Sequence, residues 1–145
     1  MRRQLTLLFA AFTATAIAAC GSDSPDLTLA PTETDVAGSY DLVVAAGHTL
    51  PFFAFETDTE SFSLAADRMI LASDRTWVDT STFAVIQLRD GSLGARVTAT
   101  AGIYEIGNGQ IKFVMTAGGS KAFTGSVTKN TLTVVSSQEK YVYNR

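Results

Sequence analysis

The sequence predicts an all-β domain whose antiparallel strands form a meander, closed into an up-and-down β-barrel or curled into a half-barrel. Apolar and polar residues alternate on both sides of a turn at Gly107-Asn108-Gly109 and of a second turn near Lys129-Asn130. About 8 to 10 short strand-like segments recur at regular spacing, and no segment has the period of a full helix. Sequential hairpins of this kind build meanders, and closure removes the strand edges that invite aggregation.

The first nineteen of the 145 residues do not belong to that domain. A short positive start at Arg2 and Arg3 precedes an apolar run from Leu5 to Ile17. This run is too short for a stable membrane span. Residues 1–19 are therefore predicted to be a secretory signal peptide.

The end of this segment resembles the lipobox of a bacterial lipoprotein signal, through Ile17, Ala18, Ala19 and Cys20. The resemblance implies transfer of a diacylglycerol to the Cys20 sulfur, cleavage before Cys20, and acylation of the new amino terminus by palmitate or a similar chain. Several acyl chains make a stable membrane anchor. The alternative is an ordinary signal peptide whose cleavage site contains a cysteine. Cys20 is the only cysteine, so no intramolecular disulfide can form.

Residues 20–35 are predicted to be a flexible, lipid-anchored linker, because they are rich in Ser, Thr, Asp and Pro. The formal net charge of the whole chain is −3, and it becomes −5 without Arg2 and Arg3. Nucleic-acid binding needs clustered positive charge, so nucleic acid is excluded as a partner. The predicted membrane contact is therefore made by the acyl groups on Cys20, and the predicted location is the bacterial cell envelope, at the outer membrane or its periplasmic face.

The strands of the domain, residues 36–145, are expected in the following order. Alternation predicts a first strand at 39–45, and Pro51 places an edge or bend before the aromatic run 52–55. That run is either a covered core strand or an exposed patch. An acidic loop is expected at 56–60. Further strands are expected at 68–72, 76–78, 82–88, 97–106, 111–115, 123–128, 131–135 and 141–143.

The two C-terminal hairpins also predict which side chains point inward. Phe123, Gly125 and Val127 share a face that Leu132 and Val134 continue. The opposite face is rich in Thr, which keeps β propensity while offering water a hydroxyl, so it is expected to be solvated. In the preceding hairpin the apolar set is Tyr104, Ile106, Ile111 and Phe113. For the Tyr141–Tyr143 strand, the sequence does not indicate which side chains point inward.

Several stretches together resemble bacterial lipocalin-like domains. They are Gly38-Ser39-Tyr40-Asp41-Leu42, Ala72-Ser73-Asp74-Arg75-Thr76-Trp77, Gly102-Ile103-Tyr104 with Ile111-Lys112-Phe113, Phe123 to Val127 with Asn130 to Thr133, and Tyr141-Val142-Tyr143. The chain departs from the pattern at Tyr40, where lipocalins have Trp, and at Arg75, where a turn Gly is usual. The resemblance implies a barrel that binds a small apolar ligand.

Large inward side chains can either line a ligand cavity or fill the barrel themselves. The candidate ligand-lining residues are Tyr40, Leu42, Trp77, Tyr104, Ile106, Phe113 and Phe123. A connected cavity of a few hundred Å3 would favour a ligand binder. A filled barrel would favour the alternative, a non-catalytic structural or protein-interaction module such as an inhibitor or an accessory subunit.

Catalysis and metal binding find little support in the sequence. His48 is the only histidine, and no nucleophile motif accompanies it, so it is expected to be a polar turn residue. The carboxylates at 58, 60, 67, 74 and 79 lack the spacing of a calcium loop and are expected in solvated loops. The sequence predicts a protein that is not an enzyme and that uses neither metal nor cofactor.

Overall fold

The computed structural model of the chain describes residues 36–116 and 121–145. The predicted signal peptide 1–19, the predicted lipid-attachment residue Cys20 and the linker 20–35 lie outside the described residues. Within those residues, no helix has the length and apolar character needed to cross a membrane.

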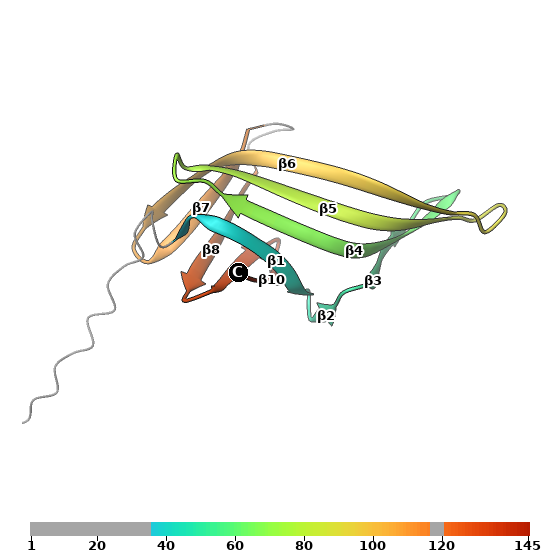
Figure 1. Cartoon of the computed structure of the whole chain (residues 1–145), viewed down its shortest axis with the longest axis horizontal. Coiled ribbons are helices and arrows are strands. Elements are labelled where there is room, and N and C mark those ends of the chain that lie inside the picture. Colours follow the sequence, from blue (N-terminus) through green and yellow to red (C-terminus); the bar gives the residue numbers. More distant parts are fainter. Residues whose placement is uncertain (1–35, 117–120) are drawn as a thin grey trace, which may run out of the picture.

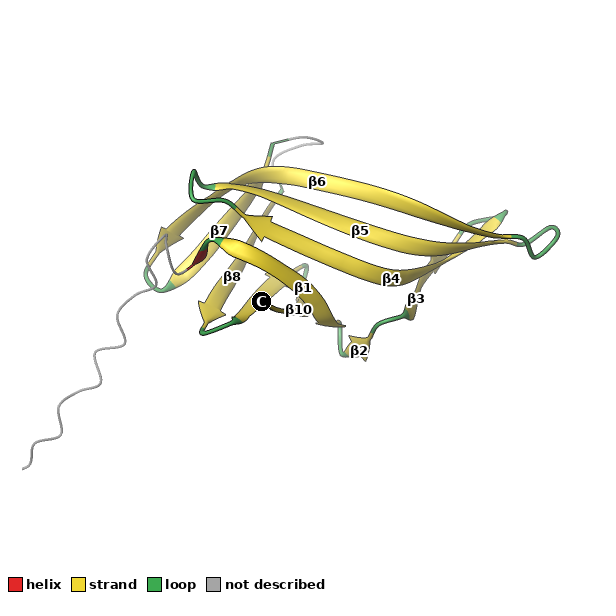
Figure 2. Cartoon of the chain, in the orientation of Figure 1, coloured by secondary structure: helices red, strands yellow, loops and turns green. Residues whose placement is uncertain are grey.

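The described ranges form one antiparallel sheet of strands joined by short connections, and the one helical residue among them is Val36, just before the first strand (Figures 1 and 2). The all-β prediction is therefore confirmed. The strands are β1 (Gly38–Ala45), β2 (His48–Thr49), β3 (Phe52–Glu56), β4 (Glu60–Leu71), β5 (Thr76–Gln87), β6 (Leu93–Gly107), β7 (Gln110–Met115), β8 (Ala122–Thr128), β9 (Thr131–Ser136) and β10 (Glu139–Asn144).

Eight of these strands close an up-and-down barrel, which is one of the two arrangements that the hairpin pattern predicted. From β4 to β10 each strand pairs with the next along the chain, and β1 then pairs with both β10 and β4. The closing β1–β4 seam is short, running from the Gly38–Leu71 pair to the Asp41–Arg68 pair. Beyond this seam, β2 pairs with the end of β1, and β3 pairs with the first half of β4. At this end of the barrel β1 and β4 therefore no longer pair with each other, and the wall is divided between them.

Three strands run far past the closed ring: β4, β5 and β6 form a long twisted extension whose tip stands away from the rest of the molecule (Figure 1). Residues 93–100 of β6 pair with β5 alone, because the β6–β7 ladder begins at Gly102 and the Ala101 carbonyl accepts from Thr116 just after β7. This stretch therefore leaves one open sheet edge beside the divided end of the barrel.

The three long strands correct several predicted boundaries. β4 begins at Glu60, inside the expected acidic loop, and β5 is one strand where two were expected at 76–78 and 82–88. In β4 the pairing shifts between Leu64 and Ala66, which marks a β-bulge at Ala65. A bulge inserts one unpaired residue and reverses the alternation that follows it. The sequence pattern therefore looked broken where the strand is continuous.

The two predicted hairpin turns are present, and residues with positive φ lie in both of them. Asn108 and Gly109 both have positive φ, of 52° and 73°, in the predicted β6–β7 turn. In the β8–β9 turn the positive φ of 56° falls on Lys129. Arg75 has φ of 68° at the position where the lipocalin-like pattern has a turn Gly.

One end of the barrel is filled by large side chains. Tyr40, Tyr104, Phe113, Ile111 and Leu132 are each 0% exposed. The predicted inward faces of the last two hairpins are thus confirmed. Gly125 does not leave room here, because a Cβ at this position would meet the Phe113 ring at 3.0 Å and the Thr133 carbonyl at 2.7 Å.

Polar groups seal the same end. The Tyr40 hydroxyl donates to the Val36 carbonyl at 2.7 Å, and the Arg145 guanidinium donates to the Tyr40 hydroxyl at 2.6 Å. The Arg145 Cζ atom also lies 4.9 Å from the centre of the Tyr40 ring. The last residue of the chain thereby fixes the segment that leads into β1.

Candidate functional site

The other end of the barrel holds a cavity of about 290 Å3. It lies inside the ring where β6 parts from β7, and strands on every side of the barrel contribute to it. Eight of its lining residues are apolar: Leu42, Leu64, Met69, Trp77, Phe83, Met115, Phe123 and Val134. The remaining lining residues are polar or carry a hydroxyl: Asp67, Asp79, Ser81, Thr100, Ser136, Tyr141 and Tyr143.

Two carboxyl groups from neighbouring strands face this cavity. Asp67 on β4 is opposite Ser81 on β5, while Asp79 on β5 is opposite Met69. The two carboxyls therefore occupy diagonal positions on one face of the β4–β5 ladder, within reach of each other. The bulge at Ala65 puts Asp67 on this face, since uninterrupted alternation from Leu64 would have turned it outward.

The carboxyl pair is poorly satisfied by the protein. Asp67 is 7% exposed, and its Oδ2 atom accepts a hydrogen bond of 2.6 Å from the Ser81 hydroxyl. The Oδ1 atoms of Asp67 and Asp79 are both buried, and among the described residues neither has a hydrogen-bond partner. Buried polar atoms are nearly always paired, so two such atoms in one cavity are unusual.

The electrostatics of the pair follow from this burial. Desolvation, followed by the negative charge of Asp67, raises the pKa of Asp79 to about 8. Burial and the two carboxyls also raise the pKa of Tyr143 far above its usual range. Burial raises the pKa of Tyr141 to about 12, with a hydrogen bond of 2.8 Å to Glu139 as a further cause. Both phenols are therefore neutral near pH 7, and Asp79 carries a proton there.

Aromatic side chains form the floor of the cavity. Trp77 meets Phe113 and Phe123 edge to face, with ring centres 5.9 and 5.4 Å apart, and its indole N–H donates to the Ile103 carbonyl at 3.0 Å. Phe113 and Phe123 stack at 4.8 Å. Gly102 permits this packing, because a Cβ there would collide with the Val114 carbonyl and the indole ring.

The predicted ligand-lining residues divide between the floor and the filled end. Leu42, Trp77 and Phe123 line the cavity. Tyr40, Tyr104 and Phe113 point inward but are fully buried below it, and Ile106 packs against the same core. The open question about the last strand also has an answer, since both Tyr141 and Tyr143 face the cavity.

The sequence reasoning missed the carboxyl pair. Asp67 and Asp79 were expected in solvated loops, whereas both lie inside long strands and face inward. A signal was present in β5, because Asp79 and Ser81 follow Trp77 at the two-residue period of one strand face. For Asp67 there was none, because the bulge that turns it inward is set by strand pairing.

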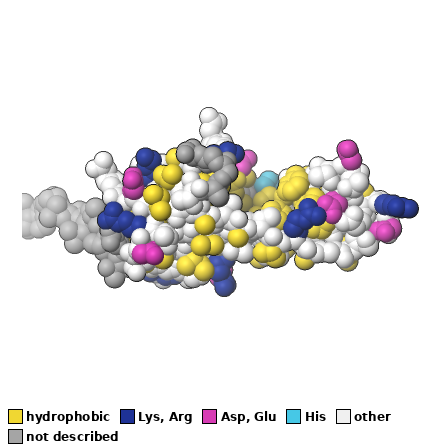
Figure 3. Space-filling model, turned by 90° about the horizontal axis from the view of Figure 1, so that it is seen from above, with side chains coloured by type: hydrophobic (Ala, Val, Ile, Leu, Met, Phe, Trp, Pro, Cys, Tyr) yellow, Lys and Arg dark blue, Asp and Glu magenta, His cyan; other side chains and the backbone are white. Residues whose placement is uncertain are grey.

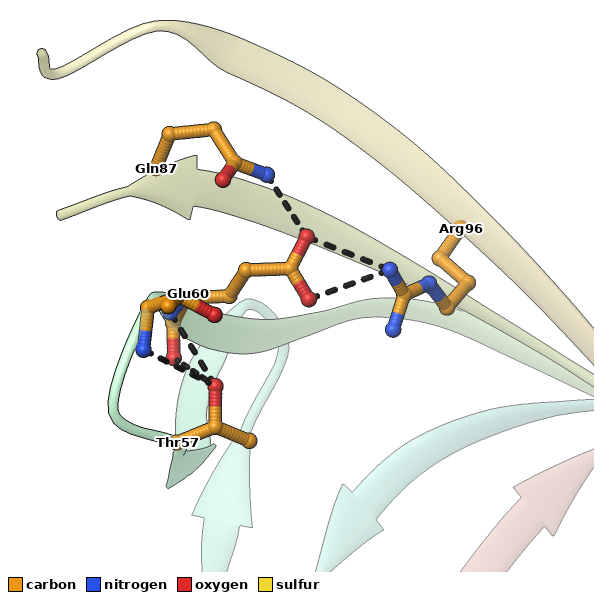
Figure 4. A network of polar contacts seen from close by, with 5 residues as sticks. Thr57, Glu60, Gln87 and Arg96 are labelled. Carbon is orange, nitrogen blue, oxygen red and sulfur yellow. Dashed lines mark hydrogen bonds and ion pairs between the residues drawn. The ribbon is translucent and has the colours of Figure 1, made fainter. Parts of the chain in front are cut away.

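A second polar cluster ties the extension together. The Glu60 carboxylate accepts a hydrogen bond of 2.6 Å from Gln87 and bonds of 3.2 and 3.1 Å from Arg96, joining β4, β5 and β6 (Figure 4). The Arg96 Cζ atom lies 4.9 Å from the centre of the Phe62 ring. Thr57 closes the turn before β4 by accepting the Glu60 backbone N–H at 3.0 Å. Every charge in this cluster has a partner, so it is a structural brace.

The outer surface carries scattered apolar side chains. In the view from above, charged groups are scattered along the length of the molecule among apolar and other side chains (Figure 3). Leu93 and Val97 on β6 are 83% and 63% exposed. The run 52–55 was predicted to be either a covered core strand or an exposed patch, and it is partly both. Phe52 packs against the core, while Phe53 and Phe55 are exposed.

Metal binding lacks a ligand set in the described part of the chain, where no group of three or more His, Cys, Asp or Glu side chains comes together. His48 stacks on Phe52 with ring centres 5.6 Å apart and does not line the cavity.

Comparison with protein-family models, with curated proteins and with solved structures finds no match to this chain.

Proposed function

We propose that the barrel, residues 36–145, binds a small, largely apolar molecule, and that acyl groups on Cys20 hold it at the bacterial cell envelope. The cavity of about 290 Å3 is the observation that supports ligand binding. Its composition, a mainly apolar wall with a few convergent polar groups, is typical of small-molecule sites. Its size, at the lower end of the usual range, favours a compact ligand of one or two rings.

The filled-barrel alternative receives less support. An interaction module would be expected to pack its interior completely, and here packing is complete only at the Tyr40 end. The open edge of β6 at residues 93–100 could pair with another strand, as in β-augmentation. Nothing in the described residues indicates what such a strand would be, so ligand binding remains the leading proposal.

Acid–base catalysis is a second candidate, and the Asp67–Asp79 pair is the observation that favours it. A carboxyl group in a cleft whose pKa is strongly raised, as that of Asp79 is, is one mark of active sites. A catalytic role would require that the bound molecule be chemically changed. The experiment that follows therefore also examines the identity of any bound compound before and after incubation.

Native mass spectrometry of the full-length protein, purified gently from its host, tests the binding proposal. A reproducible extra mass that is lost on denaturation is expected. If the bound compound is recovered unchanged after incubation with the protein, the result supports a carrier. If the compound is converted to another one, the result supports an enzyme. A protein of the unliganded mass that also takes up no added apolar probe would overturn the proposal.

The anchor is tested separately with Cys20→Ala. Without the sulfur the protein cannot be acylated, so labelling with radioactive palmitate should disappear and the protein should leave the membrane fraction. Retention of the variant in membranes without any acyl label would contradict the anchor.

A further inference from the structure

The charge inside the cavity has one sign only. Asp67 and Asp79 supply two carboxyl groups, and no Lys, Arg or His is among the residues that line the cavity. The two basic side chains nearest in sequence to these carboxyls have other roles. Arg68 faces outward and pairs with Asp41 at 2.6 Å, and Arg75 lies in the β4–β5 turn. Within residues 36–116 and 121–145, the cavity therefore lacks a countercharge from a basic side chain.

The unpartnered atoms point to what is missing. The buried Oδ1 atoms of Asp67 and Asp79 make no hydrogen bond within the described residues, and the donors beside Asp67 are the Tyr143 hydroxyl and the proton of Asp79. Leaving buried acceptors unsatisfied is costly, so a ligand that donates to both would gain more than one that only fills the space. A primary ammonium group has three N–H donors and the opposite charge, which suits two adjacent carboxyl oxygens.

The rest of the wall suits the remainder of such a molecule. Trp77, Phe83 and Phe123 present aromatic surface to the same cavity. Aromatic faces attract organic cations as well as apolar groups. Leu64, Met69 and Val134 add aliphatic surface for a hydrocarbon body.

We propose that the cavity selects a small organic cation, an amine with an apolar body, whose ammonium group is held by the carboxyl groups of Asp67 and Asp79. This inference rests on the proposed ligand-binding function and adds the chemical class of the ligand. The floor formed by Trp77 and Phe123 receives the apolar body, and an anionic ligand is excluded by repulsion.

The titratable groups around the pair predict how binding depends on pH. Tyr141 and Tyr143 on β10 also face the cavity, and burial raises the pKa of each, so both stay neutral between pH 6 and pH 8. The β6 and β9 residues that face the cavity, Thr100 and Ser136, do not titrate. The proton on Asp79 is then the one that a bound cation displaces, and affinity for a cation should rise from pH 6 to pH 8.

The test compares three probes of similar size on the full-length protein held in phosphatidylcholine vesicles. Calorimetric titration at pH 8 with 2-phenylethylammonium, 2-phenylethanol and phenylacetate varies the charge while the ring stays the same, and protein-free vesicles give the blank. We expect the cation to bind about tenfold or more tightly than the alcohol, as one charge-assisted hydrogen bond provides, and the anion to bind least.

Variants test whether the preference for the cation comes from the two carboxyl groups. Asp67→Asn and Asp79→Asn should each reduce cation affinity about tenfold. Binding of the alcohol, which also reports that the cavity is intact, should change less than twofold. Asp58→Asn makes the same charge change at an exposed turn and should leave all three affinities unchanged.

The outcomes separate this inference from the function on which it rests. Equal binding of cation and alcohol to the wild-type protein would overturn the cation preference and leave ligand binding standing. A cation preference that survives in both Asn variants would overturn the role of the pair. Failure of all three probes to bind would count against the cavity as a ligand site and so against the proposed function itself.

Discussion

Replacing Asp79 by Asn should make the stability of the barrel nearly independent of pH between about pH 5 and pH 7. In the folded protein, burial and the charge of Asp67 raise the pKa of Asp79 to about 8 from an ordinary value of 3.8. Between these two values the folded state keeps a proton that the unfolded chain releases. The free energy of unfolding of the wild-type protein must therefore fall as pH rises through this window.

The magnitude follows from the proton difference. One proton per molecule corresponds to about 1.4 kcal/mol per pH unit, so the wild-type protein should lose about 3 kcal/mol between pH 5 and pH 7. The loss ends once the pH exceeds the folded-state pKa of about 8. Asn has the shape of the protonated acid and does not titrate, so Asp79→Asn removes this slope and is the more stable protein at pH 8.

Urea denaturation of the full-length protein, followed through the emission of Trp77, measures this difference. Trp77 is the only tryptophan in the chain and lies beside the cavity, so its signal reports on the barrel. The matched control is Asp58→Asn, which removes a carboxyl from an exposed turn and should keep the wild-type slope. A wild-type free energy that stays level from pH 5 to pH 7, or an equal slope in Asp79→Asn, would refute the reasoning.

Three further substitutions test the packing and the brace by chemical denaturation. Tyr104→Ala removes a fully buried ring and should cost at least about 3 kcal/mol, whereas Tyr104→Phe keeps the ring, loses the hydroxyl bond to Ala72 and should cost about 1 kcal/mol; equal effects would contradict the core position. Gly102→Ala places a methyl group against the Val114 carbonyl and should cost about 1–3 kcal/mol, and a neutral result would show that β6 and β7 can separate there. Arg96→Met should cost less than about 1 kcal/mol, because the Arg96 side chain is 51% exposed, and a larger loss would mean that the extension depends on this ion pair.

The hairpins near the C-terminus could be predicted closely from the sequence. Both turns contain Asn, the first with Gly on either side of it, and the flanking side chains alternate cleanly, so the turns and the inward faces follow from local rules. Tyr104, Ile111, Phe113 and Leu132 all lie inside the barrel as expected. Local pattern is sufficient here because each of these strands pairs only with its sequence neighbours through regular ladders.

The β4–β5 region could not be predicted in the same way. The polar stretch at Asp79-Thr80-Ser81 resembled a break between two strands, although it is the part of β5 that faces the cavity. Polar residues within a strand have the same composition as a turn. Only the pairing of β5 with β4 and β6 shows which of the two they are.

The sequence by itself determined that this chain forms an antiparallel all-β meander, because alternation and turn chemistry act over a few residues. Closure into a barrel, where the sequence left a half-barrel open, was decided by the pairing of β1 with β4. The tertiary structure alone decided where the barrel is filled and where it is hollow. It also decided that Asp67 and Asp79 meet, since a one-residue bulge at Ala65 reverses which side chains of β4 face inward. A shift of that kind depends on how two whole strands align, and the free energy that fixes it comes from contacts between residues distant in the sequence.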